Sequence, residues 1–253
     1  MNLFHRVMGD GPPLLILHGL FGSSDNWQTH ARVFAQSHTV YLIDQRNHGH
    51  SPHEHGMNYD VLANDLFELV AHLGLRDVRL IGHSMGGKTI MRFAQQYSFL
   101  IDKMVVADMG VKAYPPHHDE VFKGLFAVDV LHCTSRKEAE SRLANYVTDS
   151  GTGQFLLKNL YWKEPGVLDW RFNLQEIYEK REHLMEALPL EKVDSTVLFL
   201  TGGKSHYVLG SDHESIREMA PNACFLSMEN AGHWLHVDQP EAFMQHCLDF
   251  FMS

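Results

Sequence analysis

Six short apolar runs recur along the chain, and polar or turn-forming residues bound each of them. The runs are continuous rather than alternating, as expected for strands that are covered on both faces of a sheet. They are Leu14–Leu17, Thr39–Ile43, Val78–Ile81, Met104–Ala107, Thr196–Leu200 and Cys224–Leu226. The pattern therefore predicts six buried strands.

Helical patterns lie between the strands. The clearest spans Asp60–Leu73, where apolar residues recur on one stripe and Gly74 is placed to end the helix. Further helices are expected at Met85–Tyr97, Asp212–Met219 and Glu241–Phe251. Strands that alternate with helices predict the α/β class, with a mostly parallel sheet and helices on both faces.

The alternation stops between about residues 111 and 190. This stretch carries helical patterns at Glu120–Val130, Lys137–Val147 and Leu174–Glu182, together with several aromatic residues and no convincing strand. We interpret it as a helical insertion over the carboxyl edge of the sheet, where open α/β sheets bind their ligands. The expected division is a core of residues 1–110 and 191–253 and an inserted helical cap of residues 111–190.

Composition and charge exclude several classes of protein. The 253 residues have a formal net charge of −10, so a nucleic-acid binder is not expected. No window approaches 18 consecutive apolar residues, so no membrane-spanning helix is expected. No targeting segment is expected at the N-terminus, and Cys133, Cys224 and Cys247 follow neither a metal-binding nor a CxxC spacing. These features predict a cytoplasmic protein with reduced thiols.

Two catalytic motifs overlap at Gly82–Thr89, directly after one predicted strand. Residues 82–86 (GHSMG) fit the nucleophile elbow G-x-S-x-G, and residues 82–89 (GHSMGGKT) fit the phosphate-binding P-loop. Asp108 ends another apolar strand, where a P-loop protein would place a magnesium-binding acid. A P-loop usually follows the first strand of its domain, however, and Lys88 lies only 20 residues before Asp108. Both motifs predict strand, turn and helix, so this segment alone does not decide between them.

An elbow makes further demands elsewhere, and the chain meets them in order. Upstream, the glycine-bearing turn His18–Gly22 can point a backbone N–H at the space above Ser84. We expect the amides of Leu20 and Met85 to form an oxyanion hole. Downstream, His233 lies in the last strand-to-helix turn, where it can take the serine proton and return it to the leaving group.

Four segments together resemble the α/β-hydrolase superfamily. They are HGLFGSSDNW, DQRNHGHSPH, GHSMGGK and AGHWLHVDQP. The string RNHG-x-SPH and the segment WRFNL are similar to one branch, the YbfF-type bacterial esterases and their mitochondrial relative abhydrolase domain protein 11. The resemblance covers nearly the whole chain and is weaker in the insertion. It implies a mostly parallel eight-stranded sheet with a helical cap, serine hydrolysis without a cofactor, and carboxylic-ester or thioester substrates.

The chain departs from many members of the superfamily at the acid of the catalytic triad. Those members carry it in a G-x-x-D-type loop after the strand equivalent to Thr196–Leu200, whereas this chain has Ser205 there. Other members take the acid from the end of the strand beside the nucleophile strand, which here is Asp108. We therefore expect Asp108 to be the acid. Asp212 is the alternative, although helix capping also explains it, and a site without a carboxylate partner is a third possibility.

The aromatic residues and histidines near the predicted strand ends are candidates for the substrate pocket. The candidates are Phe21, His83, Tyr114, Phe155, Trp162, Tyr207 and Trp234. Asp44 and Arg46 are expected to form a buried ion pair that ties loops together, and contact with substrate is the alternative. His117 and His118 lie beside Asp119, but no third ligand is evident, so no metal site is expected.

These residues predict a serine esterase that acts on a small-molecule acyl ester or thioester, with no metal or cofactor, as a monomer or homodimer. Ser84 would attack the carbonyl, His233 would act as base and then acid, and Asp108 would orient the imidazole. An acyltransferase, a lyase or a C–C bond hydrolase could use the same three residues. More remote alternatives are a P-loop nucleotide-binding protein and an inactive relative that serves as a binding module.

Overall fold

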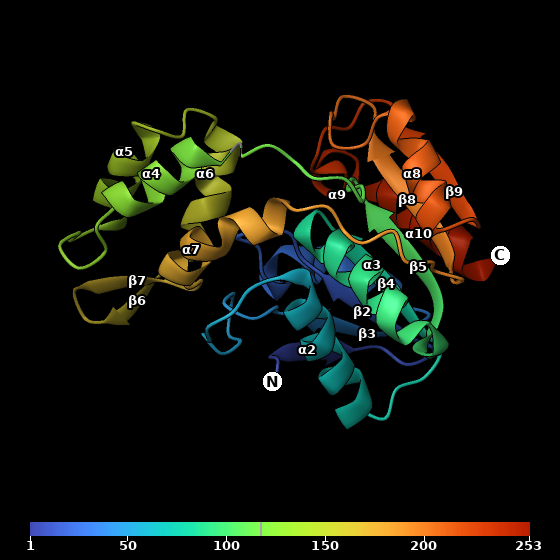
Figure 1. The fold of residues 1–253 in the computed structure, drawn as a ribbon. Helices are drawn as coiled ribbons and strands as arrows, with labels where there is room; N and C mark the ends of the chain where they lie inside the picture. The colour runs from blue at the N-terminus through green and yellow to red at the C-terminus, as the bar shows by residue number, and fades with distance from the viewer. Residues whose placement is uncertain (117) are drawn as a thin grey trace.

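The computed structural model describes residues 1–116 and 118–253, and within them seven strands form one sheet in the order β1-β3-β2-β4-β5-β8-β9 (Figure 1). Neighbouring strands run parallel, except that β1 is antiparallel to β3. The strands are β1 (His5–Met8), β2 (Pro13–Leu17), β3 (Thr39–Ile43), β4 (Val78–His83), β5 (Ile101–Ala107), β8 (Thr196–Gly202) and β9 (Ala223–Met228). All six apolar runs lie within these strands, so the prediction of a mostly parallel sheet is confirmed.

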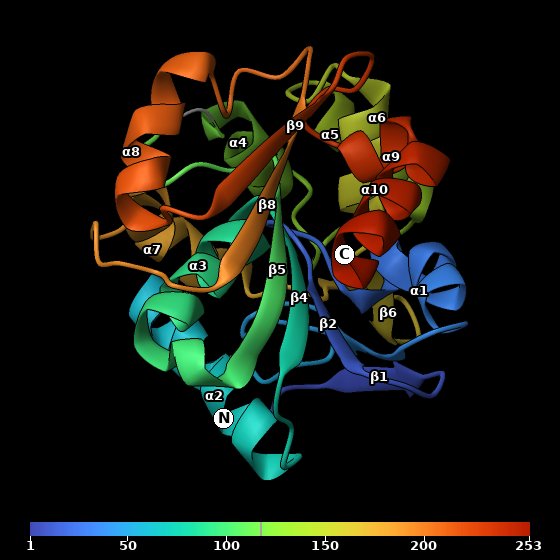
Figure 2. The ribbon, with the colours of Figure 1, turned by 90° about the vertical axis from the view of Figure 1, so that its right-hand side faces the viewer.

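Helices cover both faces of the sheet, as Figure 2 shows. One face carries α2 (Tyr59–His72), α3 (Met85–Tyr97) and α8 (His213–Met219), and the other carries α1 (Gln28–Phe34), α9 (Leu235–Asp238) and α10 (Pro240–Met252). Alternate residues of one strand enter different cores: Leu15 packs on the first face and Leu14 on the second. Burial on both faces is why the strands read as continuous apolar runs. No helix in the described residues is long and apolar enough to cross a membrane.

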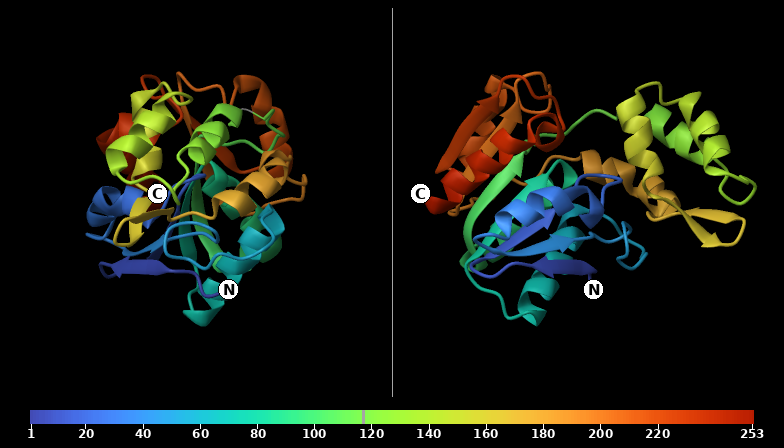
Figure 3. Two further views of the ribbon diagram at one scale, coloured as in Figure 1. Left: turned by 90° about the vertical axis from the view of Figure 1, so that its left-hand side faces the viewer. Right: turned by 180° about the vertical axis from the view of Figure 1, so that it is seen from behind.

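The chain between β5 and β8 forms a separate group of elements beyond the carboxyl ends of the strands, which Figures 1 and 3 show from the front and from behind. These elements are α4 (Asp119–Ala127), α5 (Arg136–Ala144), α6 (Ser150–Leu157), β6 (Leu160–Glu164), β7 (Val167–Trp170) and α7 (Leu174–Met185). Strands β6 and β7 pair as an antiparallel hairpin, so the expectation that this stretch holds no strand is wrong. The missed signal was Pro165-Gly166, because a turn with proline followed by glycine at positive φ joins two strands tightly.

Within the described residues the sheet has seven strands rather than the expected eight. Strand β1 itself is absent from the apolar runs because it lies at the sheet edge, where Val7 is 51% exposed. An edge strand needs no continuous apolar sequence, since only part of its surface is covered.

Buried polar groups hold the loop that follows β3. The carboxylate of Asp44 accepts hydrogen bonds from the amides of Ser24 (2.5 Å) and His50 (2.8 Å). The expectation that Arg46 pairs with Asp44 is wrong, because Arg46 pairs with Asp65 on α2. Its Nε and a terminal nitrogen contact the two carboxylate oxygens at 2.5 and 2.9 Å. This bidentate pair fastens the loop to the helix, and both side chains are buried.

His48 lies in the same loop and is held as a neutral ring. Its Nδ1–H donates to the Arg46 carbonyl at 2.9 Å, and its Nε2 accepts the Phe21 amide at 3.1 Å. The ring therefore has no site for a second proton unless it gives up the Phe21 contact. Burial lowers the pKa of His48 to about 3, and repulsion from His18 adds to this shift.

The Arg46–Asp65 pair should be costly to break from one side. We expect Arg46→Met to lower the free energy of unfolding by about 3–5 kcal/mol, because it leaves a buried carboxylate without its main partner. The double variant Arg46→Met with Asp65→Leu should recover most of that loss. Urea denaturation of the three proteins checks this, and equal losses in the single and double variants would contradict it.

His48 should make the fold sensitive to acid. Its pKa is about 3 in the folded chain and about 6.5 when unfolded, so between these values only the unfolded chain binds the proton. This contribution to stability is complete above about pH 6.5 and is lost as pH falls towards 3, at about 1.4 kcal/mol per pH unit. Urea denaturation at several pH values should give a shallower slope for His48→Gln. The exposed control variant His72→Gln should keep the wild-type slope, and an unchanged slope in His48→Gln would refute the assignment.

Candidate active site

Ser84 occupies a sharp turn between β4 and α3. Its backbone lies at φ 53° and ψ −118°, a strained conformation for a residue with a side chain. Two glycines make the turn possible, because a side chain at either position would collide with the backbone. A Cβ on Gly82 would lie 2.3 Å from the Gly86 carbonyl oxygen, and a Cβ on Gly86 would lie 2.5 Å from the Leu17 carbonyl oxygen. The Ser84 amide donates to the Ala107 carbonyl of β5 at 3.1 Å. This geometry is that of a nucleophile elbow.

Asp108 follows β5 directly and is fully buried. One carboxylate oxygen accepts the Gly202 amide at 3.0 Å. The other accepts the Ser205 hydroxyl at 2.5 Å and the His233 Nδ1–H at 2.7 Å. Ser205, which stands where many superfamily members have their acid, therefore donates to the acid supplied by the neighbouring strand. These three donors compensate the burial of a charged group.

His233 contacts Asp108 on one side and packs against His83, the residue before Ser84, with ring centroids 4.8 Å apart. Because Nδ1 carries the proton donated to Asp108, Nε2 is left as an acceptor. The Tyr207 ring stacks on the imidazole with centroids 3.8 Å apart, and His83 Nε2–H donates to the His233 carbonyl at 2.9 Å. Burial lowers the pKa of His83 to about 3, so this ring stays neutral. The described residues include no hydrogen bond from Ser84 to His233, a contact that often tightens only when substrate binds.

Asp212, the alternative acid, faces elsewhere. Its carboxylate contacts Lys112 Nζ at 2.6 Å and accepts the Leu209 amide at 2.8 Å. The latter bond closes the short turn that precedes α8. Asp212 thus ties the loop after β8 to the segment after β5, and it makes no contact with His233 in the described part of the chain.

The turn after β2 brings a free amide to the elbow. The Gly22 amide donates to the Gly19 carbonyl at 2.9 Å, with Phe21 at φ 59° in the third position of the turn. Phe21 is held on both sides, because its amide donates to His48 and its carbonyl accepts the Asn159 side chain at 2.9 Å. The Leu20 amide has no acceptor among the described residues. Met85 is the first residue of α3. Its amide therefore has no carbonyl acceptor within the helix.

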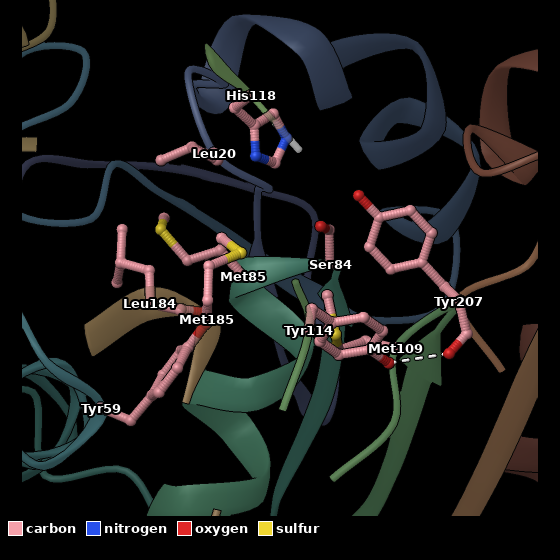
Figure 4. A pocket seen from close by; sticks show the side chains of 10 residues that line it. All are labelled: Leu20, Tyr59, Ser84, Met85, Met109, Tyr114, His118, Leu184, Met185 and Tyr207. Atoms are coloured by element: carbon pink, nitrogen blue, oxygen red, sulfur yellow. Dashed lines mark hydrogen bonds between the residues drawn. The ribbon is translucent and has the colours of Figure 1, made fainter. Parts of the chain in front are cut away.

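Two adjoining cavities open beside Ser84. The inner one has a volume of about 320 Å³ and contains Ser84 itself (Figure 4). It is lined by Leu20, Tyr59, Ser84, Met85, Met109, Tyr114, His118, Leu184, Met185 and Tyr207. The outer one has a volume of about 580 Å³ and is lined by Leu20, Pro116, His118, Asp119, Phe122, Arg181, Glu182 and Met185. Both cavities are mostly apolar, and the outer one also carries charges of both signs at Asp119, Arg181 and Glu182.

The structure brings only some of the pocket candidates to these cavities. Tyr114 and Tyr207 line the inner cavity. His83 donates a hydrogen bond to the His233 carbonyl, and the Phe155 ring packs on Trp234 with ring centroids 5.3 Å apart. Phe21 is buried against aromatic rings of the insertion, and Trp162 is 46% exposed on β6 and lines neither described cavity.

Several lining residues were not among the candidates. They are Tyr59, Met109, Leu184 and Met185 in the inner cavity, Pro116, Asp119, Phe122, Arg181 and Glu182 in the outer one, and His118 in both. Most come from the ends of the insertion, where no motif marks them. The position of Met109, directly after Asp108 at the end of β5, was a signal that could have found it.

The geometry of the Ser84 turn does not suit a P-loop. Gly82 and Gly86 lie against backbone atoms, so the turn is too crowded to wrap a phosphate. The Lys88 ammonium points away from the turn and donates to the carbonyls of Lys112 and Glu186. Within residues 1–116 and 118–253, no group of three or more histidines, cysteines or acids is placed to hold a metal, and His117 lies outside the described residues.

Comparison with known proteins agrees with this geometry. Residues 12–131 match the alpha/beta hydrolase fold family. The chain is 38% identical to the sn-1-specific diacylglycerol lipase ABHD11 of Mus musculus, covering 98% of this chain and 84% of that protein. It is 33% identical to esterase YbfF of Escherichia coli, covering 92% and 90%. A solved structure described as a marine microorganism esterase superposes with a TM-score of 0.96 at 39% identity, covering 98% of each chain. The chain is therefore a hydrolase that belongs to the α/β-hydrolase family, among its esterases and lipases.

Proposed function

We propose that the chain is a serine esterase that works through Ser84, His233 and Asp108 and a covalent acyl-enzyme. The observation that carries the proposal is the 2.7 Å contact between His233 Nδ1 and Asp108 beside the strained Ser84 elbow. The contact fixes the tautomer in which Nε2 can accept a proton. A hydroxyl, an imidazole and a buried carboxylate in this order form the machinery of acyl transfer.

The reaction has two halves. Ser84 Oγ attacks the acyl carbonyl carbon while its proton passes to His233 Nε2, and the carbonyl oxygen becomes an oxyanion. The amides of Leu20 and Met85 stabilise that charge, which exists only in the transition state and the intermediate. His233 then protonates the departing oxygen or sulfur. In the second half, water attacks the acyl carbon, His233 takes its proton, and Ser84 recovers that proton as the acid leaves.

Asp108 serves this cycle as the acceptor that orients the imidazole. Its carboxylate is held in place by hydrogen bonds from the Gly202 amide, the Ser205 hydroxyl and His233 Nδ1–H. It can therefore stabilise the imidazolium that forms in each half-reaction without taking its proton.

The two cavities suggest how a substrate lies. The inner cavity contains Ser84 and is mostly apolar, which suits the acyl group. The outer cavity carries Asp119, Arg181 and Glu182 and suits a more polar leaving group, either an alcohol or a thiol. Because α4 and α7 supply much of its lining, we propose that residues 111–190 act as a cap on a core of residues 1–110 and 191–253.

Ser84 should be the residue that a fluorophosphonate modifies. We expect intact-mass spectrometry to find one adduct on the wild-type chain and none on Ser84→Ala, because only the activated serine displaces fluoride. The same variant should lose turnover of short-chain nitrophenyl esters. Ser215→Ala, on α8, serves as the control and should be labelled like the wild type. An adduct that persists in Ser84→Ala would refute the proposed nucleophile.

Asp108 and Asp212 can be told apart by amide substitution. We expect Asp108→Asn to lower kcat by a factor of about 10⁴, because an amide at this position favours the wrong tautomer of His233. Asp212→Asn should leave kcat nearly unchanged, since its carboxylate contacts Lys112 and a loop amide. Steady-state hydrolysis of one ester by both variants makes the comparison, and the opposite ranking would move the acid to Asp212.

A further inference from the structure

Lys88 is a buried cation that the proposed mechanism does not use. It lies on α3, one turn after Ser84, and its side chain is fully buried. Among the described residues no carboxylate lies within ion-pair distance of its ammonium group. Burial lowers the pKa of Lys88 to about 8, which reflects the cost of holding a charge there. A lysine at such a position needs hydrogen-bond partners that compensate the loss of hydration.

Its partners are the two places where the chain crosses between the core and the insertion. The outgoing crossing is residues 110–114 and the returning crossing is residues 185–188; we call the two together the neck. They are bonded to each other, because the Tyr114 amide donates to the Met185 carbonyl and the Leu188 amide to the Val111 carbonyl, both at 2.8 Å. Between these two bonds, the Lys88 ammonium donates to the carbonyl of Lys112 at 2.9 Å and to that of Glu186. One side chain thus bonds both crossings to the helix that begins at the nucleophile.

Aromatic rings complete the surroundings of the ammonium group. Lys88 Nζ lies 5.0 Å from the ring centroid of Tyr114 and 5.4 Å from that of Tyr59, distances typical of cation–π contacts. Both tyrosines line the inner cavity, as Figure 4 shows. The Tyr59 hydroxyl also donates to the carbonyl of Leu184, just before the returning crossing, at 2.9 Å. The lysine is therefore packed directly behind one wall of the cavity.

The neck continues this wall towards the catalytic histidine. Tyr114 is the last residue of the outgoing crossing, and its hydroxyl accepts the Gly110 amide and donates to the Tyr207 carbonyl, both at 2.8 Å. Tyr207 stacks on His233. Met185, from the returning crossing, lines both cavities. A shift of the neck would displace Met185 and Tyr114 together and leave the Ser84 elbow in place.

We propose that Lys88 is a positioning residue for ester hydrolysis: it clamps both crossings of the neck and so fixes the wall of Tyr114 and Met185 against which the acyl chain packs. The proposal rests on the proposed esterase function. It assigns Lys88 to substrate fit rather than to the chemistry at the carbonyl. Its loss should therefore harm a substrate in proportion to how far the acyl chain reaches along the wall.

The test is the dependence of activity on acyl chain length in Lys88→Met, which keeps the apolar stem and removes the donors. We expect kcat/KM for a hexanoyl nitrophenyl ester to fall by about 10–100-fold, mainly through KM, and that for the acetyl ester to change by less than about 3-fold. Hydrogen exchange at the Tyr114 and Leu188 amides should become faster. Lys103→Met is the matched control, because Lys103 also donates to a backbone carbonyl, that of Phe250, and lies over its ring, near the amino end of β5 and away from Ser84.

The outcomes separate this proposal from the esterase assignment. If the wild-type chain neither hydrolyses esters nor takes a fluorophosphonate on Ser84, the esterase function itself fails. If it does both, but Lys88→Met loses acetyl and hexanoyl activity in equal proportion or keeps the wild-type selectivity, the clamp is overturned. Should Lys88→Met not fold, Lys88→Ala refolded with propylammonium should recover chain-length selectivity. Tetramethylammonium, which has no N–H donor, should not restore it, and equal rescue by both ions would also overturn the clamp.

Discussion

The arrangement of the site depends on one buried carboxylate. Asp108 is removed from water, so its charge is tolerable only where donors surround it. Its donors come from the end of β8, from the loop after β8 and from the loop after β9. The carboxylate therefore ties together the carboxyl ends of three neighbouring strands. The position of the imidazole follows from this requirement, because His233 supplies one of the bonds that the buried charge needs.

The same requirement accounts for the serine at position 205. Many superfamily members place their acid in this loop, and a carboxylate at Ser205 would face Asp108 at hydrogen-bond distance. Two buried carboxylates this close would repel each other, and one would have to take up a proton. A hydroxyl reverses the interaction, since Ser205 donates to the oxygen that also accepts from His233. An acid at Asp108, after β5, therefore requires a hydrogen-bond donor such as Ser205, rather than a second acid, in the loop after β8.

The sequence could predict elements and residues whose physical role demands a particular residue type. Strands covered on both faces must be apolar throughout, and the elbow must have glycines at 82 and 86 because other backbone atoms occupy the space of a Cβ. Elements with exposed surface were harder to find. Strand β1 lies at an edge, the β6–β7 hairpin exposes Trp162, and α6 has Gly151 and Gly153, which weaken a helical pattern.

The sequence did not reveal the roles of residues whose partners are backbone atoms. Lys88 stands in a motif typical of phosphate binding, yet its partners are two carbonyls some 24 and 98 residues away, and any residue type offers a carbonyl. Leu184 and Met185 line the inner cavity because the returning crossing pairs with the outgoing one in a particular register. That register is set by contacts in three dimensions rather than by local composition. The proposed catalytic groups are therefore predictable from residue type and order, whereas the shape of the pocket follows from how two distant backbone segments meet over α3.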